Sequence, residues 1–202
     1  KVATAFGSHS SAYAVTIDTE SRIVVAGYVN IGNNIDFAVA RYMSTGSLDM
    51  SFSADGKLAT AIGTGNDYGN AVAVDSAGRI IVAGYSHNGG NTDFAVVRYT
   101  SAGELDTNFS TDGKTVTAIG TGDEIAYGVA IDSGDRILAA GYSATAGGDD
   151  FAVVRYNTDG SLDNYFGGGD GIVTTDFGIS ETDRGNAVAV DLQDRIVVAG
   201  ES

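Results

Sequence analysis

Asp36-Phe37-Ala38-Val39-Ala40-Arg41-Tyr42 is the stretch that decides the fold, because it recurs nearly unchanged at Asp93–Tyr99 and Asp150–Tyr156. Both steps are 57 residues, from 36 to 93 and from 93 to 150. A second motif, RIVVAGY at Arg22–Tyr28, recurs in closely similar form from Arg79 and Arg136, and from Arg195 as far as Gly200. An internal repeat of this length must be interpreted before any single element.

Each repeat holds four short runs rich in Val, Ile, Ala, Thr and aromatic residues, separated by Gly, Asp, Asn and Ser. In the second repeat the runs are Ala71–Asp75, Ile80–Tyr85, Phe94–Tyr99 and Thr115–Ile119. Short runs bounded by turn residues are typical of strands. Four antiparallel strands repeated at this period predict the blades of an all-β propeller. The alternative is a β-solenoid, whose coils are usually shorter and less hairpin-like.

Side-chain size predicts the strand order, because the innermost strand of a propeller crowds the central axis. Runs that alternate small and branched residues are therefore expected innermost: Ala14–Ile17, Ala71–Val74, Gly128–Ile131 and Ala187–Val190. Under this order Val2–Phe6 is an outermost strand, and the last repeat lacks its third strand. We expect a single repeat domain over 1–202 of about 3.75 blades, with units at 1–6 (an outer strand), 12–63, 69–120, 126–178 and 185–202. Its open edge predicts an arc of a larger propeller, or completion by another chain, because exposed ladders promote aggregation.

The composition excludes several functional classes. The 202 residues include no Cys, which excludes disulfides, thiolate zinc sites and a Cys nucleophile. The formal net charge is −15, with 26 acidic and 11 basic residues, which argues against nucleic acids and anionic membranes as partners. No apolar run approaches the roughly 20 residues of a membrane helix, and no signal peptide is recognisable at Lys1, so we expect a mature chain or a fragment.

The ordered motifs resemble a known family. Arg-Ile-(Ile/Val)-Val-Ala-Gly-Tyr, Asp-Phe-Ala-Val-Val-Arg-Tyr, Gly-Ser-Leu-Asp, and then Phe and Asp-Gly-Lys are together similar to the bacterial delta-60 repeat, over essentially the whole chain. The resemblance implies a β-propeller in an exported bacterial protein, at the cell surface or outside the cell. It implies no shared activity and no catalytic residues.

Most charged residues follow the repeat, which favours structural roles for them. Arg41, Arg98 and Arg155 each stand eight residues before an acid of the following loop, and a planar guanidinium can bind a carboxylate in two places. We therefore predict three pairs that fix these loops. The pairs are Arg41 with Asp49, Arg98 with Asp106, and Arg155 with Asp163.

Tyrosines outside the repeated motifs are the best candidates for exposed contacts, because aromatic rings stack on sugars and on partner side chains. The candidate binding residues are Tyr13, Tyr68, Tyr127 and Tyr165, with the loop residue His87. We expect a protein or a glycan as partner.

One segment has the alternating oxygen ligands of a calcium loop around a glycine. Its candidate ligands are Asn157, Asp159, Ser161 and Asp163. The alternative is a plain Asx turn, and no other cofactor is expected. No Gly-x-Ser-x-Gly motif is present, and no two acids stand out as a catalytic pair.

These observations predict a non-catalytic binding or architectural module. Two alternatives stay open: a hydrolase or lyase with its site on the loops of one propeller face, and a calcium-stabilised extracellular assembly in which a neighbouring chain supplies the missing strand.

Overall fold

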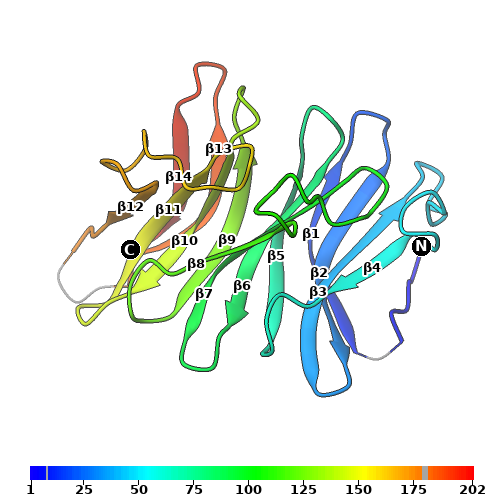
Figure 1. The fold of residues 1–202 in the computed structure, drawn as a ribbon, viewed down its shortest axis with the longest axis horizontal. Helices are drawn as coiled ribbons and strands as arrows, with labels where there is room; N and C mark the ends of the chain where they lie inside the picture. Colours follow the sequence, from blue (N-terminus) through cyan, green and yellow to red (C-terminus); the bar gives the residue numbers. More distant parts are fainter. Residues whose placement is uncertain (8, 179–181) are drawn as a thin grey trace.

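The computed structural model describes residues 1–7, 9–178 and 182–202. The described chain forms three four-stranded antiparallel sheets and one two-stranded sheet, which lie side by side (Figure 1). No helix long and apolar enough to cross a membrane occurs in these residues. The sheets do not close into a ring, so the all-β, partial-propeller prediction is confirmed.

Each sheet is one blade, and its strands follow one another in chain order. Blade 1 consists of β1 (Ser10–Ile17), β2 (Ile23–Ile31), β3 (Asn34–Tyr42) and β4 (Lys57–Thr60). Blade 2 consists of β5 (Asp67–Val74), β6 (Ile80–His87), β7 (Thr92–Tyr99) and β8 (Lys114–Thr117). Blade 3 consists of β9 (Glu124–Ile131), β10 (Ile137–Ala144), β11 (Asp149–Tyr156) and β12 (Ile172–Thr175). Blade 4 consists of β13 (Arg184–Val190) and β14 (Ile196–Glu201).

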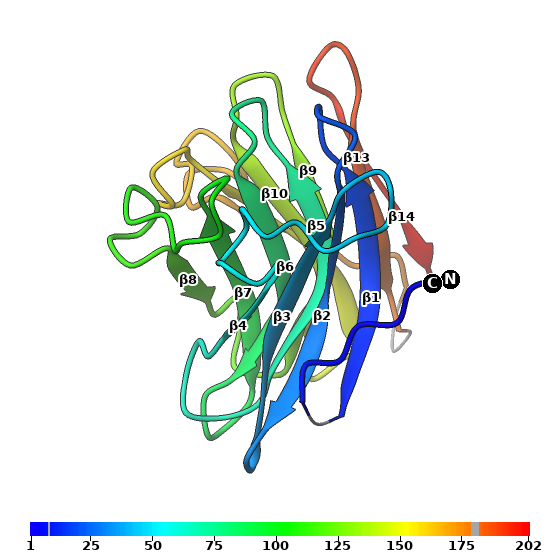
Figure 2. The ribbon, with the colours of Figure 1, turned by 90° about the vertical axis from the view of Figure 1, so that its right-hand side faces the viewer.

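The hydrophobic core lies between the blades. Branched residues of β2 and β3 pack against Ile80, Val82 and Val97 of blade 2. The same contact recurs between blades 2 and 3 and between blades 3 and 4. The first strands of successive blades are neighbours, β1 with β5, β5 with β9, and β9 with β13. In Figure 2, β1 and β13 lie along one side of the molecule and the fourth strands β4 and β8 along the other.

Two expectations about strand limits were wrong. The innermost strands begin three or four residues earlier than predicted, at Ser10, Asp67, Glu124 and Arg184. A β-bulge interrupts the alternation in each of these strands, so the apolar pattern shows only the part after the bulge. Val2–Phe6 is not one of the strands of the four sheets, although it lies beside blade 1.

Candidate functional site

The bulge places one side chain of every innermost strand at an equivalent position. The pairing register skips a single residue in each of these strands, and a bulge re-aims the side chain that it carries. The skipped residues are Tyr13, Asn70, Tyr127 and Asn186. Tyr13 and Tyr127 therefore occupy the same repeat position. The expectation that both lie outside the repeated positions was wrong.

These bulge residues surround a hollow of about 510 Å³. We call it the tyrosine hollow. Its lining comes from all four blades and consists of Tyr13, Tyr68, Asn70, Tyr85, Ile125, Tyr127 and Asn186. Three of the five predicted binding residues, Tyr13, Tyr68 and Tyr127, thus lie at one site, together with two amides and Tyr85.

The phenol rings of the tyrosine hollow contact one another. Tyr68 and Tyr85 are stacked, with ring centroids 5.0 Å apart and planes at 17°. Tyr28 joins the cluster at its edge, 5.1 Å from Tyr68 and 5.5 Å from Tyr13. Rings held in this way present flat apolar faces with little freedom to lose on binding.

Burial raises the pKa of phenols in and beside the hollow. Burial, and then the neighbouring phenols Tyr68 and Tyr13, raise the pKa of Tyr85. Burial and Tyr127 raise the pKa of the adjacent Tyr142 to about 12. Arg184 lies over this adjacent Tyr142, with its guanidinium 4.8 Å from the ring centre, and pairs with Asp149. Among the residues that the structure describes, no Asp, Glu, Lys or Arg lines the hollow itself.

The remaining two predicted binding residues lie elsewhere. Tyr165 is 96% exposed and belongs to the loop between β11 and β12. His87 is exposed at the end of β6, where its Nδ1 accepts a hydrogen bond from the Gly89 amide at 3.2 Å. Neither residue is part of the tyrosine hollow.

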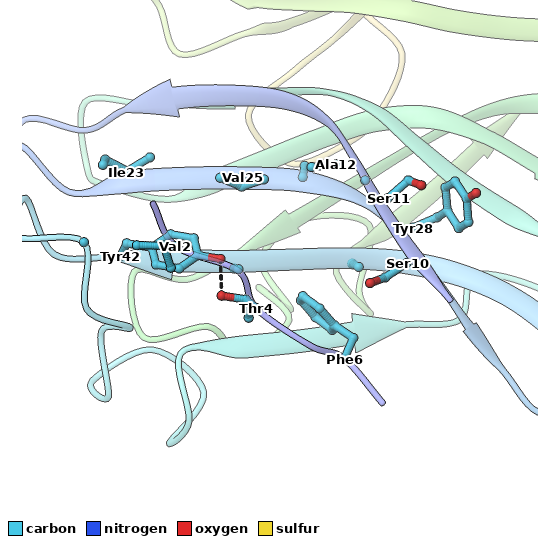
Figure 3. A pocket seen from close by; sticks show the side chains of 15 residues that line it. Val2, Thr4, Phe6, Ser10, Ser11, Ala12, Ile23, Val25, Tyr28 and Tyr42 are labelled. Carbon is cyan, nitrogen blue, oxygen red and sulfur yellow. Dashed lines mark hydrogen bonds between the residues drawn. The ribbon is translucent and has the colours of Figure 1, made fainter. Parts of the chain in front are cut away.

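A second hollow, of about 420 Å³, lies on the flank of blade 1 (Figure 3). Val2, Thr4 and Phe6 line one side of it, and Ile23, Val25, Ala38 and Tyr42 are among the residues of blade 1 that line the other. We call it the flank groove. At the equivalent positions of blade 2, Ile80, Val82, Ala95 and Tyr99 are buried against blade 1.

Val2–Phe6 occupies the place of an outermost strand of a preceding blade. The Tyr42 hydroxyl is hydrogen bonded to Thr4 Oγ1 at 2.7 Å. The same hydroxyl pair joins blades 2 and 3 to the outer strand before each of them, Tyr99 to Thr60 and Tyr156 to Thr117, both at 2.8 Å. Blade 1 therefore has a segment in the place of a neighbouring blade's outermost strand, with a groove where the rest of that blade would pack.

The arginines at the ends of β3, β7 and β11 contact the predicted carboxylates. The Nε–Oδ2 distance is 2.8 Å for Arg41 and Asp49, 2.9 Å for Arg98 and Asp106, and 2.8 Å for Arg155 and Asp163. Each guanidinium also lies 4.5–4.8 Å from the ring centre of a loop phenylalanine, Phe52, Phe109 or Phe166. These contacts fix the loop between the third and fourth strands, which is a structural role.

The candidate calcium ligands form local hydrogen bonds. Asp159 Oδ1 accepts from the Ser161 amide and hydroxyl at 2.9 and 2.6 Å. The Asn157 side-chain amide donates to Ser161 Oγ and to the Leu162 carbonyl. Asp163 binds Arg155. No group of three or more His, Asp or Glu suited to a metal ion occurs in the described part of the chain.

Comparison with known proteins agrees with the fold. Three segments of the chain, residues 21–52, 78–109 and 135–166, match a family model described as "Domain of unknown function (DUF5122) beta-propeller". Each segment begins just before the second strand of a blade and ends in the loop after the third strand. No curated protein gives a significant match. The sheets and these matches together identify the chain as a β-propeller repeat protein.

Proposed function

We propose that the chain is a non-catalytic binding module of a secreted or surface bacterial protein, and that the tyrosine hollow binds a neutral glycan. The observation that carries this proposal is the convergence of Tyr13, Tyr68, Tyr85 and Tyr127 from three blades on one hollow. Pyranose rings have apolar faces that stack on phenol rings, and their hydroxyls pair with amides such as those of Asn70 and Asn186.

The charge distribution supports a neutral ligand. The described lining contains no cation to attract an anionic sugar. The chain carries a net charge of −15, which repels anions at a distance. Nor does any carboxylate among the described lining residues offer a partner to a cationic peptide. The delta-60 resemblance supports the exported bacterial setting.

Tyrosine fluorescence offers a direct test, because the chain has ten Tyr and no Trp. Cellohexaose, xylohexaose, maltohexaose and chitohexaose are titrated separately into the protein. We expect at least one to change the emission saturably. Tyr68→Ala should weaken that binding about tenfold or more, because it removes one face of the stacked pair.

Tyr165→Ala is the matched control, since it removes an exposed phenol outside the hollow. If Tyr165→Ala abolishes sugar binding and Tyr68→Ala preserves it, the sugar does not bind in the tyrosine hollow. The absence of a saturable response to all four sugars would contradict the ligand class.

The flank groove favours a second, architectural function. We propose that further blades of the same repeat, from a longer chain or a second copy, pack into this groove beneath Val2–Phe6. Blade 4 exposes the apolar face that would pack against a following blade. Its Val197 is 57% exposed, whereas the equivalent residue of blade 1, Val24, is fully buried against blade 2. A solution mass by light scattering tests the second-copy form: a monomer at micromolar concentration excludes it.

Calcium binding by the Asn157–Asp163 loop stays a prediction. Thermal unfolding with calcium and with a chelator tests it, and a rise in Tm with calcium that Asp159→Asn abolishes would support it. Identical melting curves in calcium and chelator would remove it, together with the calcium-stabilised assembly.

A further inference from the structure

A buried acid of the same repeat position stands at the start of three innermost strands, as the first residue of β5 and β9 and the residue directly before β13. These residues are Asp67, Glu124 and Asp183, and each is fully buried. One carboxylate oxygen of each accepts a backbone N–H from the segment that follows the preceding outer strand. The donors are the amides of Ile62 at 2.7 Å, Gly120 at 3.0 Å and Phe177 at 2.7 Å. The acid therefore connects one blade to the next.

The second oxygen of each of these acids has no hydrogen-bond partner in the described structure. These oxygens are Asp67 Oδ1, Glu124 Oε2 and Asp183 Oδ1. A buried acceptor without a donor costs about 1–3 kcal/mol, and more when it is charged. Because the unpartnered oxygen recurs at one repeat position, we expect a hydrogen-bond donor to reach it in the folded protein.

A second carboxyl group lies close to each of these acids, on the third strand of the preceding blade. Asp36 interacts electrostatically with Asp67, and Asp150 with Asp183. The Thr92 amide donates to Asp123 at 2.9 Å, and the Asn91 side chain donates to the Gly122 carbonyl, so residues 91–93 lie beside residues 122–124 and Asp93 interacts with Glu124. Asp93 accepts a hydrogen bond from the side-chain amide of Asn91 at 3.3 Å and another from that of Asn88. Both partners are N–H donors, so the oxygens of Asp93 act as hydrogen-bond acceptors here.

We propose that Glu124 is protonated in the folded protein and donates this proton to Asp93, so that one shared proton joins blade 2 to blade 3. The proton supplies the missing donor to the pair and reduces its charge from two to one. Carboxyl groups in close contact share a proton in this way because both cannot remain ionised.

No cation of the described chain pairs with either acid in place of the proton. The other acid here is Asp123, which accepts from the Thr92 amide at 2.9 Å. On the side of β10, Glu124 meets the Ser143 hydroxyl at 3.4 Å. Neither Asp93, Asp123 nor Glu124 forms an ion pair within the described residues.

The shared proton makes this blade contact dependent on pH. Burial, and then its contact with Asp93, raise the pKa of Glu124 above its ordinary value of 4.5. Because the folded pKa is raised, the contribution to stability is complete below pH 4.5 and is lost as the pH rises through the folded pKa. Higher pH therefore loosens the boundary between blades 2 and 3.

Urea unfolding of wild type and Glu124→Gln between pH 4.5 and pH 8 tests the proposal. The Gln amide donates permanently where the proposed proton sits, so this variant should lose the pH dependence of that contact and unfold less readily than wild type at pH 8. The ratio of the wild-type unfolding constant to that of the variant should rise by up to tenfold per pH unit in the titration range. Glu104→Gln, which removes an exposed carboxylate, is the control and should retain the wild-type slope.

A second measurement on wild type covers the case in which Glu124→Gln fails to fold. The side-chain ¹³C shift of Glu124 is followed by NMR from pH 4 to pH 9. Titration of Glu124 above the exposed glutamates confirms the proposal. Titration at or below the Glu104 value, or a Glu124→Gln variant with the wild-type pH slope, would overturn it.

Discussion

The guanidinium of Arg98 donates a hydrogen bond from Nη1 to the carbonyl oxygen of Thr158 at 2.6 Å, 60 residues further along the chain and in the next blade. Arg41 makes the equivalent contact with Ser101 at 2.6 Å. Each arginine thus fixes its own loop through Asp106 or Asp49 and also ties that loop to the following one. The charged groups of the repeat connect blades as well as loops.

Arg98→Ala should destabilise the protein by about 3–5 kcal/mol, because it leaves the buried carboxylate of Asp106 without its cation. Arg155→Ala is the matched variant. Its arginine is more exposed, and blade 4 has no described loop between third and fourth strands for it to reach. Urea unfolding of both variants measures the difference, and equal losses would contradict the cross-blade role of Arg98.

The same pair predicts sensitivity to acid. Burial would raise the pKa of Asp106, but hydrogen bonds from Asn108 and the charge of Arg98 outweigh it and hold this pKa below its usual value of 3.8. A lowered folded pKa contributes stability above pH 3.8 that is lost as the pH falls through the folded value. We therefore expect the cost of Arg98→Ala to shrink below pH 3.8. A cost that is constant from pH 7 to pH 2.5 would disagree with this account.

The Tyr42 hydroxyl should hold Val2–Phe6 on blade 1. Tyr42→Phe removes its hydrogen bond to Thr4, and we expect faster proteolysis of this segment with a change in global stability of no more than about 1 kcal/mol. Tyr99→Phe removes the equivalent bond between blades 1 and 2, where Tyr99 is buried, and should lower global stability by about 1 kcal/mol. Limited proteolysis with mass detection compares the two variants. Cleavage of Val2–Phe6 at the same rate in Tyr42→Phe and Tyr99→Phe would argue against its attachment through Tyr42.

Gly84 is required opposite the bulge of β5. A Cβ at this residue would lie 1.8 Å from the Tyr68 carbonyl oxygen, so Gly84→Ala must displace the strand that carries Tyr68. We expect a loss of about 2 kcal/mol or more and a perturbed tyrosine hollow. Gly147→Ala, where the nearest heavy atom is 3.7 Å away, should stay within about 0.5 kcal/mol. Thermal unfolding compares them, and a neutral Gly84→Ala would show that the close approach of the two strands is dispensable.

The repeat alone predicted the blades, because a 57-residue period with four strand-like runs has few other solutions. It also placed Arg98 near Asp106, since both lie in one repeat unit. It did not predict the contact of Arg98 with Thr158, which depends on how adjacent blades stack. The early starts of the innermost strands were missed because the bulge at Tyr13 and its equivalents breaks the alternation.

The tyrosine hollow was partly predictable. Tyr13, Tyr68 and Tyr127 were expected to bind, but only the fold shows that they converge. Tyr85 was missed because its repeat position favours core packing. The acids at residues 67, 124 and 183 could have been identified from the sequence, because a carboxyl group recurs there in three repeats. Their burial could not, because it depends on how the preceding blade packs.

A crystal structure of the protein soaked with the sugar that gives the strongest fluorescence response is the most direct test of the binding account. We predict a pyranose ring stacked on Tyr68 or Tyr127, with hydroxyls near the amides of Asn70 and Asn186. Sugar density at the flank groove or beside Tyr165, with an empty tyrosine hollow, would contradict it.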